Sequence, residues 1–500
     1  MYDIMEPSGS LKNPTIAVGI DFGTTNSLIA AIVDGKCVVI PDARGSKLLP
    51  SVVAYSSGTP IVGQEALSYD SYIKSIKSLF GKSSDDLQKE NAIHRTANNI
   101  FDENGKTVIE LGGAKKFDIE IASEIIKALK SRAEEYLSCQ LSDAVITVPA
   151  YFDDGARNSV REAARLAGFN VMRLINEPTS AAYAYGLDND SEGTFLVYDL
   201  GGGTFDVSIL QMQKGICEVI ATSGDRNLGG DNIDEILAQF LWDKKGVKLS
   251  DANPQETMIA LKEARKIKEH LSHEDVYSTD EFTITSQEFN KLIEPLVNKT
   301  TSILDAIISE IDGIEIDKAI LVGGSTRIPY IKSMMQSRFA IVDGVDPDEI
   351  VVCGAAIKAS ALTGNASQGL LIDVTPLSLG IELADGMNEI IIPRNTPIPA
   401  LHKHVFSTGK DNQTGFVIHV LQGEGQIASK CRSLAKFHLK NLPPLPKGSV
   451  KVEITFQIDA DGILTAAAKE LQTNRIHQVI IKPSYGLNEE EILKLVASRS

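Results

Sequence analysis

No apolar run in this 500-residue sequence approaches the roughly 20 residues that a membrane-spanning helix needs. The first residues are polar. They have neither the apolar core of a secretory signal nor the arginines of an organelle-targeting peptide. We therefore expect residues 1–14 to form a flexible tail, and we expect a cytoplasmic protein without a membrane partner.

Closely spaced cysteines and an excess of positive charge are also missing. The five cysteines are far apart in the sequence, which excludes the usual zinc and iron–sulfur ligand spacings and favours reduced thiols. Acidic residues outnumber basic ones by 66 to 49, which gives a net charge of −17. A nucleic acid is therefore not expected as the partner, because phosphate binding needs a positive surface.

The familiar nucleotide-binding loops are absent too. No glycine-rich turn ends in the Lys-Ser/Thr pair of a P-loop, and no GxGxxG sequence opens a helix. Instead, one plan occurs twice, in VGIDFGTTNSLIA and LVYDLGGGTFDVSIL. Each segment has an apolar strand ending in Asp, a turn with Gly and Thr, and a second apolar strand. The repetition predicts two similar halves whose turns meet in a cleft, and the alternative is two unrelated hairpins.

Strand and helix patterns alternate in the first part of the chain, which predicts an α/β domain over residues 15–364. A long amphipathic helix is expected from Asp118 to Cys139. A small polar connector and the apolar run LLID follow at residues 365–373, and we interpret them as an interdomain linker. Alternating apolar residues then predict an all-β sandwich over residues 374–483. Residues 484–500 read as the start of a further helix, which we interpret as a truncated lid.

The two Gly-Thr turns suit a phosphate group. Glycine lets the backbone come close to an anion, and consecutive N–H groups form an anion-binding nest. Asp21, Asp199 and Asp206 lie at or just beyond these turns. Because Mg²⁺ keeps several waters and takes few carboxylates, the repeated pattern favours a nucleotide with Mg²⁺ over aspartates that only cap turns.

Many motifs in this sequence resemble those of the DnaK-type, seventy-kilodalton heat-shock chaperones. GIDFGTTNS, VITVPAYF, INEPTSAAYAYGL, YDLGGGTFDVSIL, ILVGGSTRIP and DPDEIVVCGAAI resemble the motifs of their actin-like ATPase domain. TPLSLGIEL, FSTGKDNQT, IHVLQGE and FQIDADGIL resemble their peptide-binding sandwich. The match runs in order from about Thr15 to Leu493. IPRNTPIP, CRSLAKF, KPSYGLNEEEI and the short segment between Ser272 and Thr285 are most similar to the HscA branch, which serves iron–sulfur cluster assembly.

The resemblance implies a role for each matching residue. Asp21 and Asp199 would hold Mg²⁺ through water, and Lys77, Glu177, Asp199, Thr204 and Asp206 would act in ATP hydrolysis. The residues implied in binding ATP or ADP are Asp21, Gly23, Thr24, Thr25, Asn26, Gly201, Gly202, Gly203, Lys268, Ser272, Gly323, Gly324, Ser325, Arg327 and Asp348. Arg265 falls where the family often has Glu, so it is left out of the predicted site. Without this resemblance, Lys77 would read as a solvated helix lysine and Glu177 as a capping residue.

The resemblance also implies coupling between the two domains. Residues that match the switch and linker are Pro149, Arg157, Leu370, Leu371 and Asp373. Those that match the peptide channel are Ile381, Met387, Phe406, Phe416 and Ile418. For any one channel residue, a place in the sandwich core is equally compatible with the pattern. Ala384 and Asp385 depart from the bulkier arch of DnaK, which suits a narrower set of clients.

The partners implied are an extended client peptide, from an iron–sulfur scaffold protein, and a J-type co-chaperone. A nucleotide-exchange factor is not expected to be required, and the protein is expected to be a monomer. Three alternatives stay open at this point. They are a general DnaK-like chaperone, an actin-like sugar kinase or filament ATPase, and a binding module without catalysis.

Overall fold

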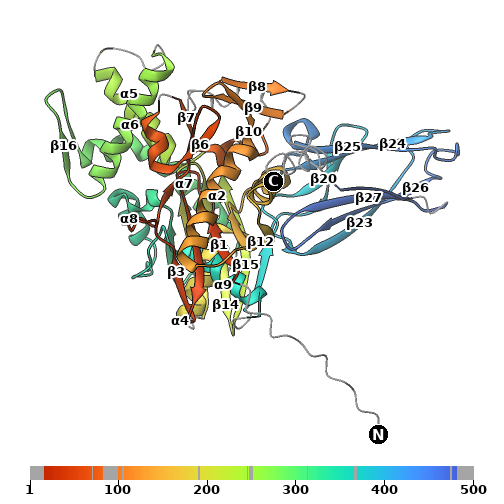
Figure 1. The fold of residues 1–500 in the computed structure, drawn as a ribbon. Coiled ribbons are helices and arrows are strands. Elements are labelled where there is room, and N and C mark those ends of the chain that lie inside the picture. Colours follow the sequence, from red (N-terminus) through yellow and green to blue (C-terminus); the bar gives the residue numbers. More distant parts are fainter. Residues whose placement is uncertain are drawn as a thin grey trace, which may run out of the picture.

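The computed structural model describes residues 16–69, 71–82, 99–103, 106–189, 192–244, 246, 252–311, 313–364, 369–472 and 476–480. The predicted tail, residues 365–368 of the predicted linker and the predicted lid helix lie outside these ranges. A large α/β part and a two-sheet β part lie side by side (Figure 1). Within the described residues, no helix has the length and apolar character needed to cross a membrane.

The first large sheet is built around the hairpin of the first Gly-Thr turn. Its strand order is β12-β11-β1-β2-β3, and β4 also pairs with β2. β1 is parallel to β11 and antiparallel to β2. Its strands are β1 (Val18–Asp21), β2 (Asn26–Val33), β3 (Lys36–Val39), β4 (Leu49–Pro50), β11 (Asp143–Val148) and β12 (Asn170–Asn176).

The second large sheet repeats this arrangement around the other Gly-Thr turn. Its order begins β18-β13-β14-β15, with β13 parallel to β18 and antiparallel to β14. Its strands are β13 (Gly193–Leu200), β14 (Phe205–Gln213), β15 (Ile216–Asp225) and β18 (Lys318–Val322). The order and directions of β3-β2-β1-β11 and β15-β14-β13-β18 agree, as the internal sequence repeat predicts.

Helices cover both sheets and define two lobes, one around each sheet. They are α2 (Asp118–Leu137), α3 (Asp154–Leu166), α4 (Glu177–Asn189), α5 (Gly230–Lys244), α6 (Pro254–Leu271), α7 (Ser286–Glu310), α8 (Pro329–Gln336) and α9 (Ile350–Leu362). The short 3₁₀ helices are η1 (Gly63–Ser68), η2 (Ile76–Leu79), η5 (Gly324–Arg327) and η6 (Ala428–Lys430). The predicted helix over 118–139 ends at Leu137, because Ser138 turns into the left-handed region.

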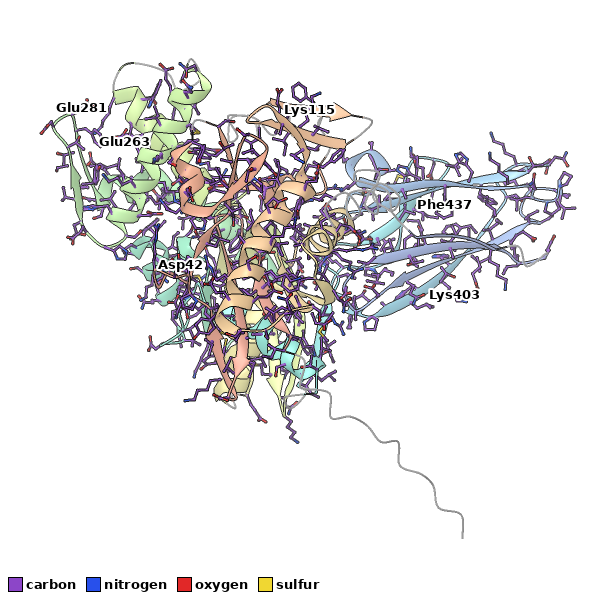
Figure 2. All side chains as sticks on the ribbon, viewed as in Figure 1. Asp42, Lys115, Glu263, Glu281, Lys403 and Phe437 are labelled. Atoms are coloured by element: carbon purple, nitrogen blue, oxygen red, sulfur yellow. The ribbon has the colours of Figure 1, made fainter. Side chains whose placement is uncertain are left out.

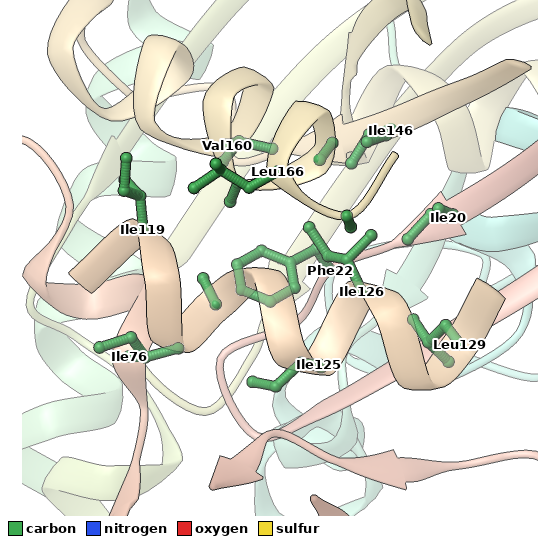
Figure 3. Close-up of a cluster of buried hydrophobic side chains, with 14 of the residues drawn as sticks. Ile20, Phe22, Ile76, Ile119, Ile125, Ile126, Leu129, Ile146, Val160 and Leu166 are labelled. Atoms are coloured by element: carbon green, nitrogen blue, oxygen red, sulfur yellow. The ribbon is translucent and has the colours of Figure 1, made fainter. Parts of the chain in front are cut away.

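The core of the first lobe lies between its sheet and helices α2 and α3. Figure 3 shows Ile20 of β1 and Ile146 of β11 facing α2, whose Ile126 and Leu129 point toward them. Apolar residues three and four positions apart give α2 one buried face, which is why this segment folds as a helix on the sheet. A separate cluster forms the core of the second lobe under α5, α6 and α7.

Smaller sheets complete the lobes. They are β6-β5-β7 and β10-β9-β8 in the first lobe and the hairpin β16-β17 in the second. Their strands are β5 (Val52–Ser56), β6 (Thr59–Val62), β7 (Tyr72–Lys74), β8 (Asn99–Glu103), β9 (Lys106–Leu111), β10 (Ala114–Phe117), β16 (Val276–Ser278) and β17 (Thr283–Thr285). Figure 2 shows Lys115 of β10 and Glu263 of α6 in the upper part of the molecule, the first on the first lobe and the second on the second lobe.

The C-terminal part is a sandwich of two four-stranded antiparallel sheets, as the alternating pattern predicts. The sheets have the orders β21-β20-β24-β25 and β23-β26-β27-β28. Figure 2 shows Phe437 on one sheet and Lys403 on the other. The strands are β20 (Leu379–Glu382), β21 (Asn388–Ile392), β23 (Ala400–Ser407), β24 (Gly415–Gln422), β25 (Arg432–Lys440), β26 (Lys451–Ile458), β27 (Leu464–Glu470) and β28 (Ile476–Ile480).

The LLID segment is a strand of the second lobe in this structure. β19 (Leu370–Val374) pairs in parallel with β15 at residues 216–218. Its other end pairs with β22 (Pro397–Ile398), which leads into the sandwich. This apolar segment therefore extends the sheet of the second lobe, with Leu370 exposed and Leu371 packed on the apolar core.

Candidate functional site: a nucleotide cleft between two lobes

The two Gly-Thr turns touch each other. A Cβ added at Gly202 would come within 2.0 Å of the Thr25 Oγ1, and one at Gly203 within 2.9 Å of the Thr24 Cγ2. Any larger residue at Gly202 would push the turns apart. Glycine here is thus required by the close approach of the two lobes, as well as being suited to an anion.

A cavity of about 390 Å³ opens around these turns. The predicted nucleotide-site residues line it, with the exceptions of Gly203 and Asp206. Gly203 faces Thr24, as described above. Asp206 lies behind the turn, where its Oδ1 accepts a hydrogen bond from the Tyr151 N–H at 3.1 Å.

Buried carboxylates gather at the phosphate end of the cleft. Burial is the main cause that raises the pKa of Asp21 to about 7, and the nearby Glu177 raises it further. The pKa of Asp199 also lies well above its usual value, first because of burial and then because of Glu177, Asp206 and Asp21. The Thr147 hydroxyl donates to Asp21 at 2.7 Å. These causes show that Asp21 and Asp199 lie near enough to repel each other.

Lys77 is the cation of this end. Its ammonium is paired with the Glu177 carboxylate, and the lysine is almost wholly buried. Lys77 lies on η2, and its neighbour Ile76 points into the lobe core near Phe22 and Ile125 (Figure 3). The apolar residues of η2 therefore anchor the short helix, and the lysine faces the cleft.

The carboxylates fit a divalent cation held through water. Lys77 is the cation that offsets the charge near Asp21 and Asp199, and it is itself paired with Glu177. In addition, the buried Asp206 Oδ2 has no hydrogen-bond partner among the described residues. Mg²⁺ takes few protein ligands and keeps several waters. Asp21 and Asp199 would hold it in that way.

The other end of the cleft holds a close backbone approach and several ion pairs. Gly323 has φ +81°, and its backbone passes so close to Leu200 that a Cβ would meet the Leu200 carbonyl at 2.5 Å. The Arg327 guanidinium pairs with Asp348 at 2.6 Å and Asp346 at 2.8 Å. Across from it, Lys268 pairs with Asp234 at 2.6 Å. Together these groups form the side predicted to bind adenosine.

Several residues of the cleft were not predicted from the sequence. Arg265 was set aside, yet it lines the cavity beside Lys268, three positions later on the same face of α6. That spacing was the available signal. Asp231, in the first turn of α5, and Asp234, one turn later on the same helix, also line it. Nothing in their local sequence indicates which side chains they meet.

Comparison with known proteins agrees with this cleft. A family model described as Hsp70 protein matches residues 17–500. The chain belongs to the Hsp70 family. It is 46% identical to the "Chaperone protein HscA homolog" of Rickettsia prowazekii over 95% of this chain and 79% of that protein. It is 43% identical to the protein of the same name in Haemophilus influenzae (strain PittGG), over 97% of this chain and 80% of that one. As a member of the Hsp70 family, the chain is an ATP-hydrolysing chaperone.

One of the residues predicted to form the switch, Arg157, contacts the sandwich. The Arg157 guanidinium donates to the Ala150 carbonyl at 3.1 Å, the Asn176 side chain at 2.7 Å and the Asp461 carbonyl at 3.3 Å. The Pro149 carbonyl accepts from the Phe152 N–H at 3.1 Å and closes the turn that holds Tyr151.

Asp373 of the linker is buried beside this switch. The Thr179 hydroxyl donates to it at 3.3 Å. Burial raises the pKa of Asp373, and the nearby Arg157 lowers it. The linker, the switch and the sandwich therefore meet at one place.

The predicted channel residues of the sandwich do not share one environment. Ile381 and Ile418 are buried in the sandwich core. Phe406 and Phe416 are half-buried against that core, whereas Met387 is 40% exposed. For each channel residue, the sequence left open a place in the sandwich core. In this structure Ile381 and Ile418 occupy such a place. Whether these side chains contact a peptide stays a prediction.

Proposed function

We propose that this chaperone uses ATP hydrolysis to switch its hold on an extended client peptide, and that it serves iron–sulfur cluster assembly. The observation that carries the ATP switch is the single cavity shared by both Gly-Thr turns, Lys77 and Glu177. The boundaries that we propose are residues 15–364 for the ATPase domain, 365–373 for the linker and 374–483 for the peptide-binding sandwich.

The residues of the cleft suit hydrolysis by water. Phosphoryl transfer needs positioning and charge neutralisation more than covalent chemistry. The glycine turns and Thr204 would cradle the phosphates, and Lys77 would neutralise charge on the transferred group. Its ion pair with Glu177 then loosens, which frees the Glu177 carboxylate to orient the attacking water. Mg²⁺, held through water by Asp21 and Asp199, would supply further charge neutralisation.

The coupling to peptide would run through hydrogen bonds. Asp206 accepts from the Tyr151 N–H, the neighbouring Ala150 carbonyl accepts from Arg157, and Arg157 reaches Asp461 of the sandwich. We infer that the linker strand and these contacts belong to the state that ATP favours and that binds peptide weakly. Nucleotide shifts peptide affinity only by binding the docked and separated states unequally.

The iron–sulfur assignment rests on similarity to chaperones named HscA and on two local features. The turn around Asp385 is tight, because the Asp385 carboxylate accepts from the Met387 N–H at 3.1 Å. With Ala384 beside it, this arch is small and suits a narrow client motif. The short β16-β17 hairpin supports independence from an exchange factor. The proposed partners are an iron–sulfur scaffold protein and a J-type co-chaperone.

The decisive experiment measures ATP turnover with and without a peptide from an iron–sulfur scaffold protein. We expect the peptide to raise the rate severalfold, and a scrambled peptide of the same composition to have no effect. Lys77→Ala should lower turnover by about 10² to 10³, since it removes a charge aimed at the transferred group. Equal stimulation by the scaffold and scrambled peptides would instead indicate a general chaperone.

A further inference from the structure

Ser75 fixes the start of the short helix that carries Lys77. It directly precedes η2, is 4% exposed, and has left-handed backbone angles of φ 56° and ψ 32°. Its carbonyl accepts hydrogen bonds from the Ser78 N–H at 2.9 Å and the Ser78 hydroxyl at 2.7 Å. A shift of Ser75 would therefore move the turn and Lys77 with it.

The Ser75 hydroxyl bonds across the cleft to the other lobe. It donates to the Asp231 Oδ2 at 2.9 Å. Asp231 lies in the first turn of α5, and its N–H donates to the Gly202 carbonyl at 2.7 Å. The Gly230 N–H donates to the Gly201 carbonyl at 2.9 Å in the same way. The first turn of α5 is thus tied to the phosphate turn of the second lobe.

We propose that Asp231 is a positioning residue, which acts through Ser75 to align Lys77 with the phosphate turn. This inference rests on the proposed role of Lys77. Asp231 contacts the Gly-Thr turn of the second lobe through its backbone. It contacts the start of η2 in the first lobe, which carries Lys77, through its carboxylate. Lys77 is then held from two sides, by Glu177 on its ammonium and by Ser75 at its backbone. The alignment exists only when the lobes are closed.

A purely local role for Asp231 makes a different prediction. An acidic residue in the first turn of a helix stabilises that helix through its dipole, whatever lies opposite. In that case Ser75 would be irrelevant to hydrolysis. The burial of Ser75 and its left-handed backbone, which few residues other than glycine adopt, favour a specific link between the lobes.

The test compares single-turnover hydrolysis of bound ATP in four variants of the full chain. Ser75→Gly removes the hydroxymethyl side chain and keeps the left-handed backbone, which glycine adopts without strain. Asp231→Ala removes the acceptor, Asp231→Asn keeps an acceptor oxygen, and the fourth variant combines Ser75→Gly with Asp231→Ala. We expect each of the first two changes to slow hydrolysis about tenfold, because small misplacements are costly. The double variant should be no slower than either single one, since both remove one link.

ATP affinity separates positioning from general damage. We expect it to stay within about twofold in Ser75→Gly, whose side chain does not line the cavity, and we expect Asp231→Asn to retain most of the hydrolysis rate. Asp243→Ala is the matched control, because this residue at the other end of α5 is exposed and its carboxylate accepts a hydrogen bond from Gln239, on the same helix. It should hydrolyse ATP at the normal rate.

The outcomes distinguish this inference from the proposed function. Normal hydrolysis by Ser75→Gly, or a double variant slowed by the product of the single effects, would overturn the link between Asp231 and Lys77. Normal hydrolysis by Lys77→Ala would overturn the role of the lysine itself. A slow Lys77→Ala combined with normal Ser75→Gly and Asp231→Ala would overturn the positioning role alone.

Discussion

The two lobes of the ATPase part and the two domains of the chain are joined by different chemistry. At the base of the lobes, α9 lies against α4 and β1 with almost no space between backbones. A Cβ at Gly354 would meet the Ser180 carbonyl at 1.9 Å, and one at Gly19 would meet the Ala356 nitrogen at 2.2 Å. The surrounding side chains form small apolar clusters. Such contacts allow hinge motion but not separation.

The sandwich meets the ATPase part largely through charged and polar groups. Arg432 of β25 pairs with Asp153 at 2.5 Å, and Asp461 pairs with Arg161. Arg394 pairs with Glu310 of α7. Water can replace such contacts when the surfaces part, so the domains can separate without exposing a large apolar core. We therefore expect the two lobes to stay in contact and the sandwich to dock and separate reversibly.

The largest expected effect on stability comes from adding a methyl group where α9 packs against α4 at the base of the two lobes. Gly354→Ala places a methyl group against the backbone of α4, so the helices must move apart. We expect it to lower the free energy of unfolding by about 3 kcal/mol, measured by urea denaturation. Gly409→Ala is the control, because Gly409 is exposed with open space around it, and its change should be near zero. Equal midpoints for the two variants would contradict a close-packed joint.

Removing the contact between Arg157 and the sandwich should leave the fold intact and weaken the coupling between nucleotide binding and peptide release. Arg157→Ala deletes the bonds to Ala150, Asn176 and Asp461 together. We expect the ATP-induced acceleration of peptide release to fall about 5- to 150-fold, the usual range of coupling between sites. The measurement is the peptide dissociation rate with ATP and with ADP. Arg165→Ala on the same helix, whose partner is the neighbouring Glu162, should behave as the unchanged chain.

The domain joint should also respond to pH. Asp154 of α3 accepts a hydrogen bond from the Leu464 N–H of the sandwich at 2.9 Å, and burial raises its pKa to about 7. The hydrogen bond from Leu464 and the charge of Arg157 lower this pKa, whereas the charges of Asp153 and Asp459 raise it, and burial outweighs the lowering causes.

A carboxyl group with a raised pKa in the docked state binds a proton more readily there than after separation. Docking therefore weakens as the pH rises from about 4, the ordinary pKa of an aspartate, to about 7, and it levels off above that. We expect a change of at most about tenfold per pH unit, since one proton is involved. Fluorescence transfer between labels on the two domains measures this, and Asp154→Asn should flatten the profile. A profile with the opposite slope would contradict the assignment.

The smallest effect should come from salt. The Arg161–Asp461 pair is partly exposed, so ions screen it. Raising the ionic strength from about 0.1 M to about 1 M should shift the docked fraction only about two- to threefold, because such pairs contribute little each. The difference in unfolding midpoint between Gly354→Ala and the unchanged chain should not depend on ionic strength in this way. The same fluorescence transfer reports the docked fraction.

Local sequence predicted the pieces of the nucleotide cleft well. The repeated hairpins, the glycine turns and the alternating strands of the sandwich depend on neighbouring residues, and they appear where the pattern indicates. The environment of single side chains was harder to predict. Ile381 and Met387 both match the peptide channel, yet one lies in the core and the other is exposed. Arg265 was left out and lines the cleft.

By itself, the sequence determined the duplicated α/β plan, because periodicity and the repeated motif record it directly. The resemblance of its motifs to those of the Hsp70 chaperones added the family and most of the residues that line the cleft. Only the tertiary structure decided that LLID forms a strand on β15, that Asp231 reaches Ser75, and that Arg157 reaches Asp461. These contacts join segments more than 150 residues apart. Which segments meet depends on how whole lobes and domains are placed, and no local pattern encodes that placement.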